Sequence, residues 1–158
     1  CGAALAALYR QTLSAIVILF LYHALFTPVY IRDPVGVLGL HLLAWASGLG
    51  IGMVLRAARP WQPDLMSILT SLIIRLDVIA SGKMTLANNM SPTLRNWFDW
   101  NPLFHVIDQG RGYIFLNYSP HFTSVLYPLY FTLALIVVGL MAEFFTHQHV
   151  SASWGKRR

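Results

Sequence analysis

Three long runs of uncharged residues constrain this chain more than any other feature. The first run has 21 residues between Arg10 and Arg32, and the second has 22 residues between Asp33 and Arg56. The third covers residues 112–142, which are 31 positions without Asp, Glu, Lys or Arg. A helix of about 20 apolar residues crosses the hydrocarbon core of a bilayer. The runs therefore predict membrane-crossing helices at roughly residues 11–31, 35–55 and 120–142.

The composition supports an integral membrane protein. The 158 residues are 56% hydrophobic and only 11% charged, whereas a soluble domain has about a quarter of its residues charged. The net charge of +5 comes without a cluster of basic residues on one soluble face, which argues against nucleic-acid binding. The single cysteine, Cys1, excludes an intrachain disulfide and a cysteine-based metal site. Because the chain begins with Cys1 rather than Met, we expect it to be the C-terminal part of a longer protein.

A further apolar stretch at residues 65–82 is interrupted by Arg75 and Asp77. With it, the sequence predicts an all-α polytopic fold in one transmembrane domain, residues 1–158, with four membrane-spanning helices. Arg75 would lie about 16 Å along the helix from Asp64, near the middle of the membrane. Charged groups at that depth must face protein or water. We expect either a polar lining for a translocation path or a structural ion-pair network, with Asp108 and Arg111 as candidate partners.

The segment between the last two spans, roughly residues 83–118, contains a short helix with its own start signal. Asn101 is a favourable N-cap, and Pro102 then occupies the first helical position, where its missing N–H costs nothing. His105, Asp108 and Arg111 recur every three residues and form a polar stripe. A helix of this length cannot cross a bilayer. It is therefore predicted to lie at the interface or to enter the membrane and return.

The basic residues indicate one orientation of the four spans. If Arg10 is cytoplasmic, four crossings also place Arg56, Arg59 and the residues 156–158 on the cytoplasmic side. This arrangement satisfies the positive-inside rule, because the loops on the other side carry both signs of charge. Both ends of the chain are therefore expected in the cytoplasm.

Two other patterns have a structural and a functional interpretation. Gly48 and Gly52 are four residues apart, a spacing that lets another helix approach closely, and we interpret them as a packing face. Aromatic residues are numerous after residue 96. They fit an interfacial belt, since Trp and Tyr favour the headgroup region, and some of them fit stacking against sugar rings.

The sequence contains no nucleophile elbow, phosphate-binding loop or paired carboxylates. His147 and His149 lie beyond the last span, and His23 and His41 lie on separate spans, so neither pair has the ligand pattern of a metal site. We therefore predict a protein that is not an enzyme and binds no metal or cofactor itself. A small membrane enzyme is the alternative, and it would carry a metal or cofactor when purified.

The segment Trp100–Arg111, which contains Asn-Pro-Leu-Phe-His followed by Asp108 and Arg111, resembles a motif of bacterial permeases. These are the membrane subunits of ABC transporters that export capsule, O-antigen or teichoic acid polysaccharides. Other elements follow in the same order: the glycine-rich span at residues 47–55, the Ser-Gly at residues 81–82 and the Ser-Pro at residues 91–92. The resemblance covers about residues 5–146 and corresponds to the last four of the six spans of such a permease.

The resemblance implies a homodimer that encloses a polymer channel in the bacterial inner membrane, with membrane lipids around it. ATPase subunits would bind on the cytoplasmic side and carry ATP and Mg²⁺. The cargo would be a cell-surface polysaccharide attached to a lipid. The alternatives are a lipo-oligosaccharide or drug exporter, or an accessory subunit derived from a truncated permease. The substrate path would use Arg75, Asp77, Trp97, Trp100, Phe104, Tyr113 and Tyr118, and the re-entrant helix would be fixed by Asn101, Pro102, His105, Asp108 and Arg111.

Overall fold

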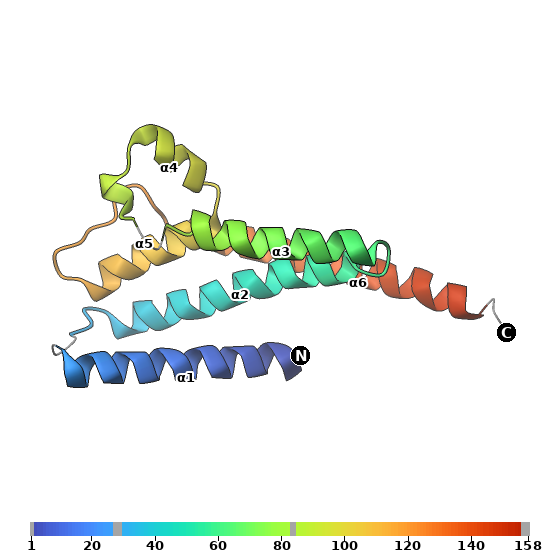
Figure 1. The fold of residues 1–158 in the computed structure, drawn as a ribbon, viewed down its shortest axis with the longest axis horizontal. Helices are drawn as coiled ribbons and strands as arrows, with labels where there is room; N and C mark the ends of the chain where they lie inside the picture. Colours follow the sequence, from blue (N-terminus) through green and yellow to red (C-terminus); the bar gives the residue numbers. More distant parts are fainter. Residues whose placement is uncertain (1, 27–29, 83–84, 156–158) are drawn as a thin grey trace.

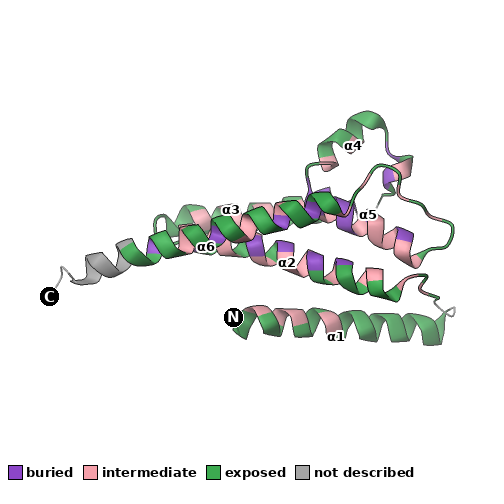
Figure 2. Cartoon of the chain, turned by 180° about the vertical axis from the view of Figure 1, so that it is seen from behind, coloured by how far each residue is buried: buried purple, intermediate pink, exposed green. Residues whose placement is uncertain are grey.

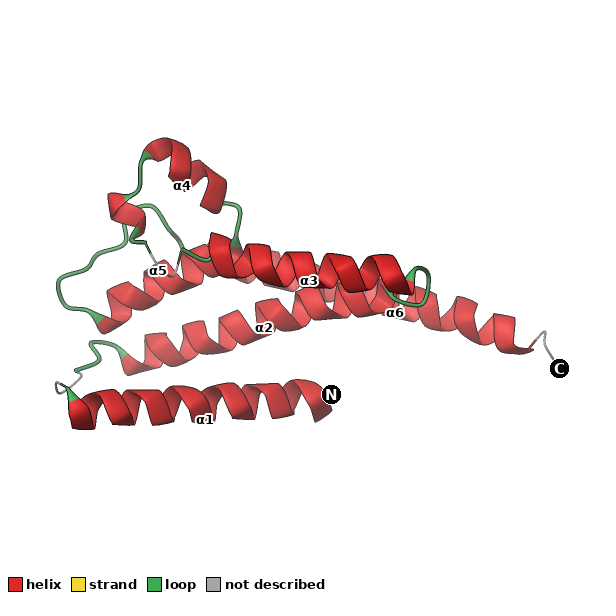
Figure 3. Ribbon diagram, viewed as in Figure 1, coloured by secondary structure: helices red, strands yellow, loops and turns green. Residues whose placement is uncertain are grey.

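The computed structural model describes residues 2–26, 30–82 and 85–155, and describes side chains as far as Gln148. Within these residues every regular element is helical (Figure 3), so the predicted all-α fold is confirmed. The elements in chain order are α1 (Gly2–Leu25), α2 (Pro34–Ala58), α3 (Pro63–Ala80), the 3-10 turn η1 (Ala87–Asn89), α4 (Pro92–Phe98), α5 (Pro102–Ile114) and α6 (Leu126–Gly155).

The four long helices lie roughly along one axis (Figure 1). α2 and α6 point in one direction, and α1 and α3 point in the other, so the start of α1 and the end of α6 face the same end of the molecule. α2 packs mainly against α6 and α5. α5 lies beside the first half of α2, and the short helix α4 stands to one side of the bundle.

Three helices are long and apolar enough to cross a membrane. They are α1, α2 and residues 126–148 of α6. Large apolar side chains along these helices are exposed, as expected for a surface that faces lipid. α3 has 18 residues but carries Asp64, Arg75 and Asp77, and it is not among the three. These helices support the assignment to the membrane proteins. That α3 also crosses the membrane, and that residues 1–158 form a single domain, stay predictions.

Two helices have other bounds than the predicted spans. α1 begins at Gly2, before the span predicted from residue 11, because Ala and Leu dominate its first turns and favour helix, and it ends at Leu25. Residues 27–29, which the predicted span included, lie outside the described part of the chain. α6 begins at Leu126 rather than at residue 120. The preceding segment is not helical because it folds back onto α5, where Gln109 binds the backbone of Thr123.

The close contact between α2 and α6 uses other glycines than the predicted pair. A Cβ atom at Gly50 would lie 3.0 Å from the Leu135 Cβ, and one at Gly139 would lie 2.8 Å from the Met53 Cβ. At Gly48 and Gly52 a Cβ atom would meet nothing within 4 Å among the described residues. Within the described residues the helix turns Gly48 and Gly52 away from α6, and Gly50 faces it. Packing of Gly48 and Gly52 against another helix stays a prediction.

These glycines offer a matched pair of variants. Gly50→Val should lower the stability of the chain by about 2 kcal/mol, because the added side chain overpacks the contact with α6. Gly48→Val should change stability by less than about 0.5 kcal/mol, because its neighbourhood is open. Thermal unfolding of the purified protein in detergent would measure both. Equal melting temperatures for the two variants would contradict the assignment of the contact to Gly50.

Buried residues gather where α5 meets its neighbours (Figure 2). One apolar cluster joins Leu40 and Leu43 of α2 to Val106 of α5. A second cluster joins Ala87 and Met90 to Phe104 of α5. No residue of α1 is buried. The best-packed part of the molecule is thus the short helix α5 and its surroundings, rather than the long helices.

Candidate functional site

α5 begins at the predicted cap. The Asn101 Oδ1 accepts a hydrogen bond of 2.9 Å from the Leu103 N–H, and Pro102 occupies the first turn. The Asn101 amide also donates to the Asp77 Oδ1 at 2.9 Å, which ties the start of α5 to the last turn of α3. At the other end, the Asp33 N–H donates to the Tyr113 carbonyl at 3.0 Å. α5 is therefore fastened at both ends to long helices.

Asp108 is the centre of a buried polar network. Its side chain is 1% exposed and accepts hydrogen bonds from the Tyr118 hydroxyl and, at 2.9 Å, from the Thr123 hydroxyl. Burial raises the pKa of Tyr118 to about 12, and the bond to the Asp108 carboxylate adds to this shift. The phenol therefore stays a hydrogen-bond donor at neutral pH. Both donors lie in the loop after α5, so Asp108 holds that loop on the helix.

His105 fastens two further segments to α5. Its Nδ1 accepts a hydrogen bond of 3.2 Å from the Ser124 N–H, and its Nε2 lies 2.9 Å from the Asp99 carbonyl oxygen. Since an N–H can donate only to an unprotonated ring nitrogen, this pattern requires the neutral tautomer with a proton on Nε2. His105 is 7% exposed and has no free ring nitrogen. Its position therefore serves structure rather than metal binding or proton transfer.

Arg111 closes the turn after α3. Its guanidinium donates to the Thr85 carbonyl at 2.6 Å and to the Gly82 carbonyl at 3.1 Å. Gly82 has a φ of 65°, which residues with side chains rarely adopt, and a Cβ atom there would lie 2.6 Å from the Phe104 ring. The turn thus needs glycine for its conformation and for its closeness to α5.

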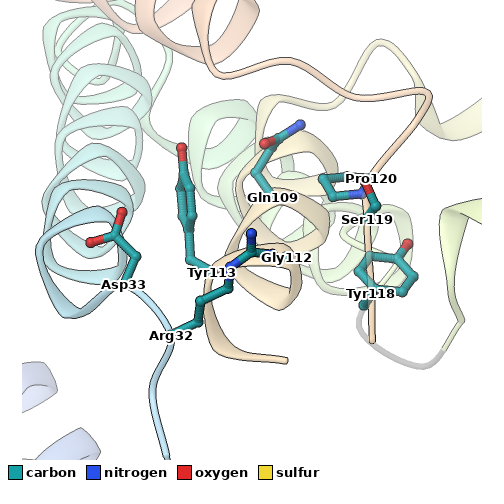
Figure 4. A pocket seen from close by; sticks show the side chains of 8 residues that line it. All are labelled: Arg32, Asp33, Gln109, Gly112, Tyr113, Tyr118, Ser119 and Pro120. Atoms are coloured by element: carbon teal, nitrogen blue, oxygen red, sulfur yellow. The ribbon is translucent and has the colours of Figure 1, made fainter. Parts of the chain in front are cut away.

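A pocket of about 300 Å³ opens at the end of the molecule where α5 stops (Figure 4). Its lining comes from the segment before α2, the last turns of α5 and the loop that follows: Arg32, Asp33, Gln109, Gly112, Tyr113, Tyr118, Ser119 and Pro120. Gly112 makes the pocket narrow on one side, because a Cβ atom there would lie 2.7 Å from the Pro120 Cδ.

The walls of this pocket combine aromatic rings with fixed polar groups. The Asp33 Oδ1 accepts from the Val35 and Gly36 N–H groups at 3.1 and 3.0 Å, so that carboxylate is held at the start of α2. Arg32 is exposed and adds a cation at the rim. Rings, a guanidinium and a carboxylate are the groups that bind sugar rings and hydroxyls or other polar ligands of similar size.

The residues predicted for the substrate path do not converge on one site. Tyr113 and Tyr118 line the pocket. Trp97 and Trp100 lie at the end of α4 and just after it, with 72% and 58% of their surfaces exposed, and neither lines the pocket. Trp97 and Trp100 therefore suit contact with lipid or with a partner.

The prediction for Phe104 was wrong. Its side chain is 1% exposed and packs against Ala87 and Met90, with the ring of Phe98 at a centroid distance of 6.0 Å. A ring that is covered on all sides cannot stack on a substrate. Phe104 points away from the polar stripe because the helix turns it toward η1, so its role is in the core.

Neither Arg75 nor Asp77 is bonded to the predicted partners Asp108 and Arg111. Asp77 accepts from Asn101, whereas Asp108 and Arg111 are occupied by the loops described above. Arg75 is exposed on α3 and makes no hydrogen bond or ion pair with another residue of the described ranges. α3 does not break between them, since the helix continues to Ala80.

Several residues of the site were missed by sequence reasoning. Gln109 donates to the carbonyl and the hydroxyl of Thr123, at 2.7 and 3.1 Å. Asp33 caps the start of α2, a role that the sequence analysis does not assign to it. The Asp-Pro step before an apolar run is a start signal for a helix, which would have identified Asp33 as a cap. Nothing local marks Thr123, because its role depends on a loop that folds back.

No group of three histidine, cysteine, aspartate or glutamate residues lies close enough to hold a metal ion within the described ranges. His149 was considered in the sequence, but its side chain lies outside them. No family model matches the chain, and no curated protein or solved structure matches it either.

Proposed function

We propose that this chain is the membrane permease of an ABC exporter that moves a cell-surface polysaccharide, attached to a lipid, outward across the bacterial inner membrane. In this proposal α1, α2, α3 and α6 cross the membrane with both chain ends cytoplasmic. A second copy completes the polymer channel, and a separate ATPase supplies the energy. The chain itself forms no covalent bond with the cargo.

The observation that carries the proposal is the position of α5. The end of α5 is bonded to Asp33, at the start of α2, and Val106 packs between Leu40 and Leu43. From Asp33 to Leu43 the chain advances ten residues, which is about 15 Å along α2. If α2 crosses the membrane, α5 begins well inside it and rises to its surface. A short capped helix in that position is what the resemblance to the exporter permeases implies.

The exposed face of α3 also supports a polar path. Asp64, Ser67, Ser71 and Arg75 follow at intervals of three or four residues, and all four are exposed. Such spacing places them on one face of the helix. In a crossing helix this face would meet water or a second protein rather than lipid. The pocket with Tyr113 and Tyr118 would then lie near the outer end of the path.

Deletion of the full-length gene tests the proposed function. We expect the surface polysaccharide to disappear and to accumulate inside the cell, and we expect an ATPase to co-purify with the tagged protein from the complemented strain. Immunodetection of polymer on intact and on lysed cells measures the first result. Normal surface polymer without a co-purifying ATPase would contradict the exporter. Stoichiometric retention in another complex would instead favour the accessory subunit.

A further inference from the structure

A long groove between α1 and α2 is not used by the proposed path. Its volume is about 830 Å³, and α1 contributes Arg10, Gln11 and Ser14 to its lining, while α2 contributes His41, Trp45 and Gly48. α1 is held to α2 by a hydrogen bond of 3.1 Å between Thr12 and His41 and by one of 3.1 Å from the Trp45 indole to the Ala4 carbonyl. The two helices are thus bridged by polar contacts, with open space between them.

The groove lies along the apolar length of α2. Gly48 is eight residues from Arg56, which is about 12 Å along the helix, and fourteen residues from Pro34, which is about 21 Å. Arg10 belongs to α1, one of the helices apolar enough to cross a membrane. If these helices cross, the Arg10 guanidinium lies at the depth of the hydrocarbon rather than in the cytoplasm, where the sequence analysis expected it.

A positive charge at that depth needs an anionic partner. An arginine that faces hydrocarbon is strongly unfavourable. Arg10 makes no hydrogen bond or ion pair with another residue of the described ranges, and no aspartate or glutamate is among the residues that line the groove. Gln11 and Ser14 add neutral hydrogen-bond donors on the same side of α1. The groove therefore offers a cation and two polar donors to an anion that the described residues do not supply.

We propose that the groove between α1 and α2 binds the phosphate group of a membrane lipid, with the Arg10 guanidinium as its main ligand. Arginine pairs with phosphate through two parallel hydrogen bonds, which suits a lipid headgroup. Apolar residues at the ends of the lining, Ala7, Ile18 and Leu103, would contact the hydrocarbon chain. The proposal rests on the membrane insertion in the proposed function and is independent of the exported cargo.

Native mass spectrometry of the detergent-purified full chain tests this proposal. Titrations would use phosphatidylglycerol, a polyprenyl phosphate and, as the lipid without phosphate, diacylglycerol. We expect at least one of the two phosphate lipids to bind about tenfold more tightly than diacylglycerol. Arg10→Gln should weaken phosphate-lipid binding by about tenfold, whereas Arg59→Gln, which removes an equal charge outside the groove, should leave it unchanged. Equal affinity for the two phosphate lipids identifies an ordinary phospholipid site, and preference for the polyprenyl phosphate identifies a carrier-lipid site.

A second variant keeps the positive charge of Arg10 and fills part of the groove. Ser14→Leu should also weaken phosphate-lipid binding, because its larger side chain occupies the groove beside Arg10. Unchanged binding in both Arg10→Gln and Ser14→Leu would overturn the proposal, and so would equal losses in Arg10→Gln and Arg59→Gln. Absence of phosphate-lipid binding to the unaltered chain would overturn it as well and would favour a protein helix in the groove. Loss of the exporter function would change none of these measurements.

Discussion

Replacing Arg75 with leucine should abolish surface polymer while the protein remains in the membrane at normal abundance. Arg75 bonds no other residue of the described ranges, so its removal breaks no hydrogen bond or ion pair within them. It lies at the end of the exposed polar face of α3 that begins with Asp64, Ser67 and Ser71. In the proposed exporter, this face lines the path, and an arginine there holds water and polar cargo at a depth that is otherwise apolar. Leucine would close that section to a polar chain.

The experiment needs variants that separate charge from folding. Arg75→Lys keeps the positive charge and should retain most of the export, and Ile74→Leu alters the neighbouring exposed residue without changing polarity. Immunoblots of the membrane fraction would report abundance, and antibody binding to intact cells would report polymer. Normal polymer in Arg75→Leu would remove Arg75 from the path. Replacing Asp77 is a weaker test of the path, because its hydrogen bond with Asn101 also fixes the start of α5.

Local signals predicted the elements of this chain well. The uncharged runs identified α2 within one residue at its start, and the Asn101–Pro102 pair identified the start of α5. Both predictions use short-range physics. A spanning helix must be as long as the hydrocarbon core is thick, and the first turn of a helix has N–H groups that need a cap. The boundary of α6 could not be predicted in this way, because the chain before Leu126 is ordered by bonds to α5 rather than by its own sequence.

The same reasoning could not predict contacts between residues that are far apart in the sequence. The stripe of His105, Asp108 and Arg111 was predicted, but its partners lie in three segments, after α3, α4 and α5, that no local pattern joins to it. Phe104 is an example. An aromatic residue beside a polar stripe can form a stacking surface or part of a core, and only its packing against η1 shows that it belongs to the core. For Gly48 and Gly52, the spacing was right for a packing face, but the partner helix approaches Gly50.

The polar stripe also makes one strong prediction about stability. Asp108→Leu should destabilise the end of the molecule that carries α5 by roughly 3 kcal/mol, because the partly buried hydroxyls of Tyr118 and Thr123 lose their acceptor. The loop that carries both donors should then leave α5, and the pocket with it. Thermal unfolding in detergent would measure the loss of stability, and chymotrypsin cleavage after the exposed Phe122 would measure the release of the loop.

Two further variants show whether the bonds to Asp108 cause the effect. Asp108→Asn keeps an acceptor oxygen and should cost clearly less than leucine, whereas Asp64→Leu, at an exposed carboxylate on α3, should change stability by about 0.5 kcal/mol. If Asp108→Leu melted and was cleaved like the unaltered chain, the loop would be held by something other than this carboxylate. The expected order, with Asn between the unaltered chain and Leu, follows because each lost acceptor bond leaves a partly buried hydroxyl unpaired.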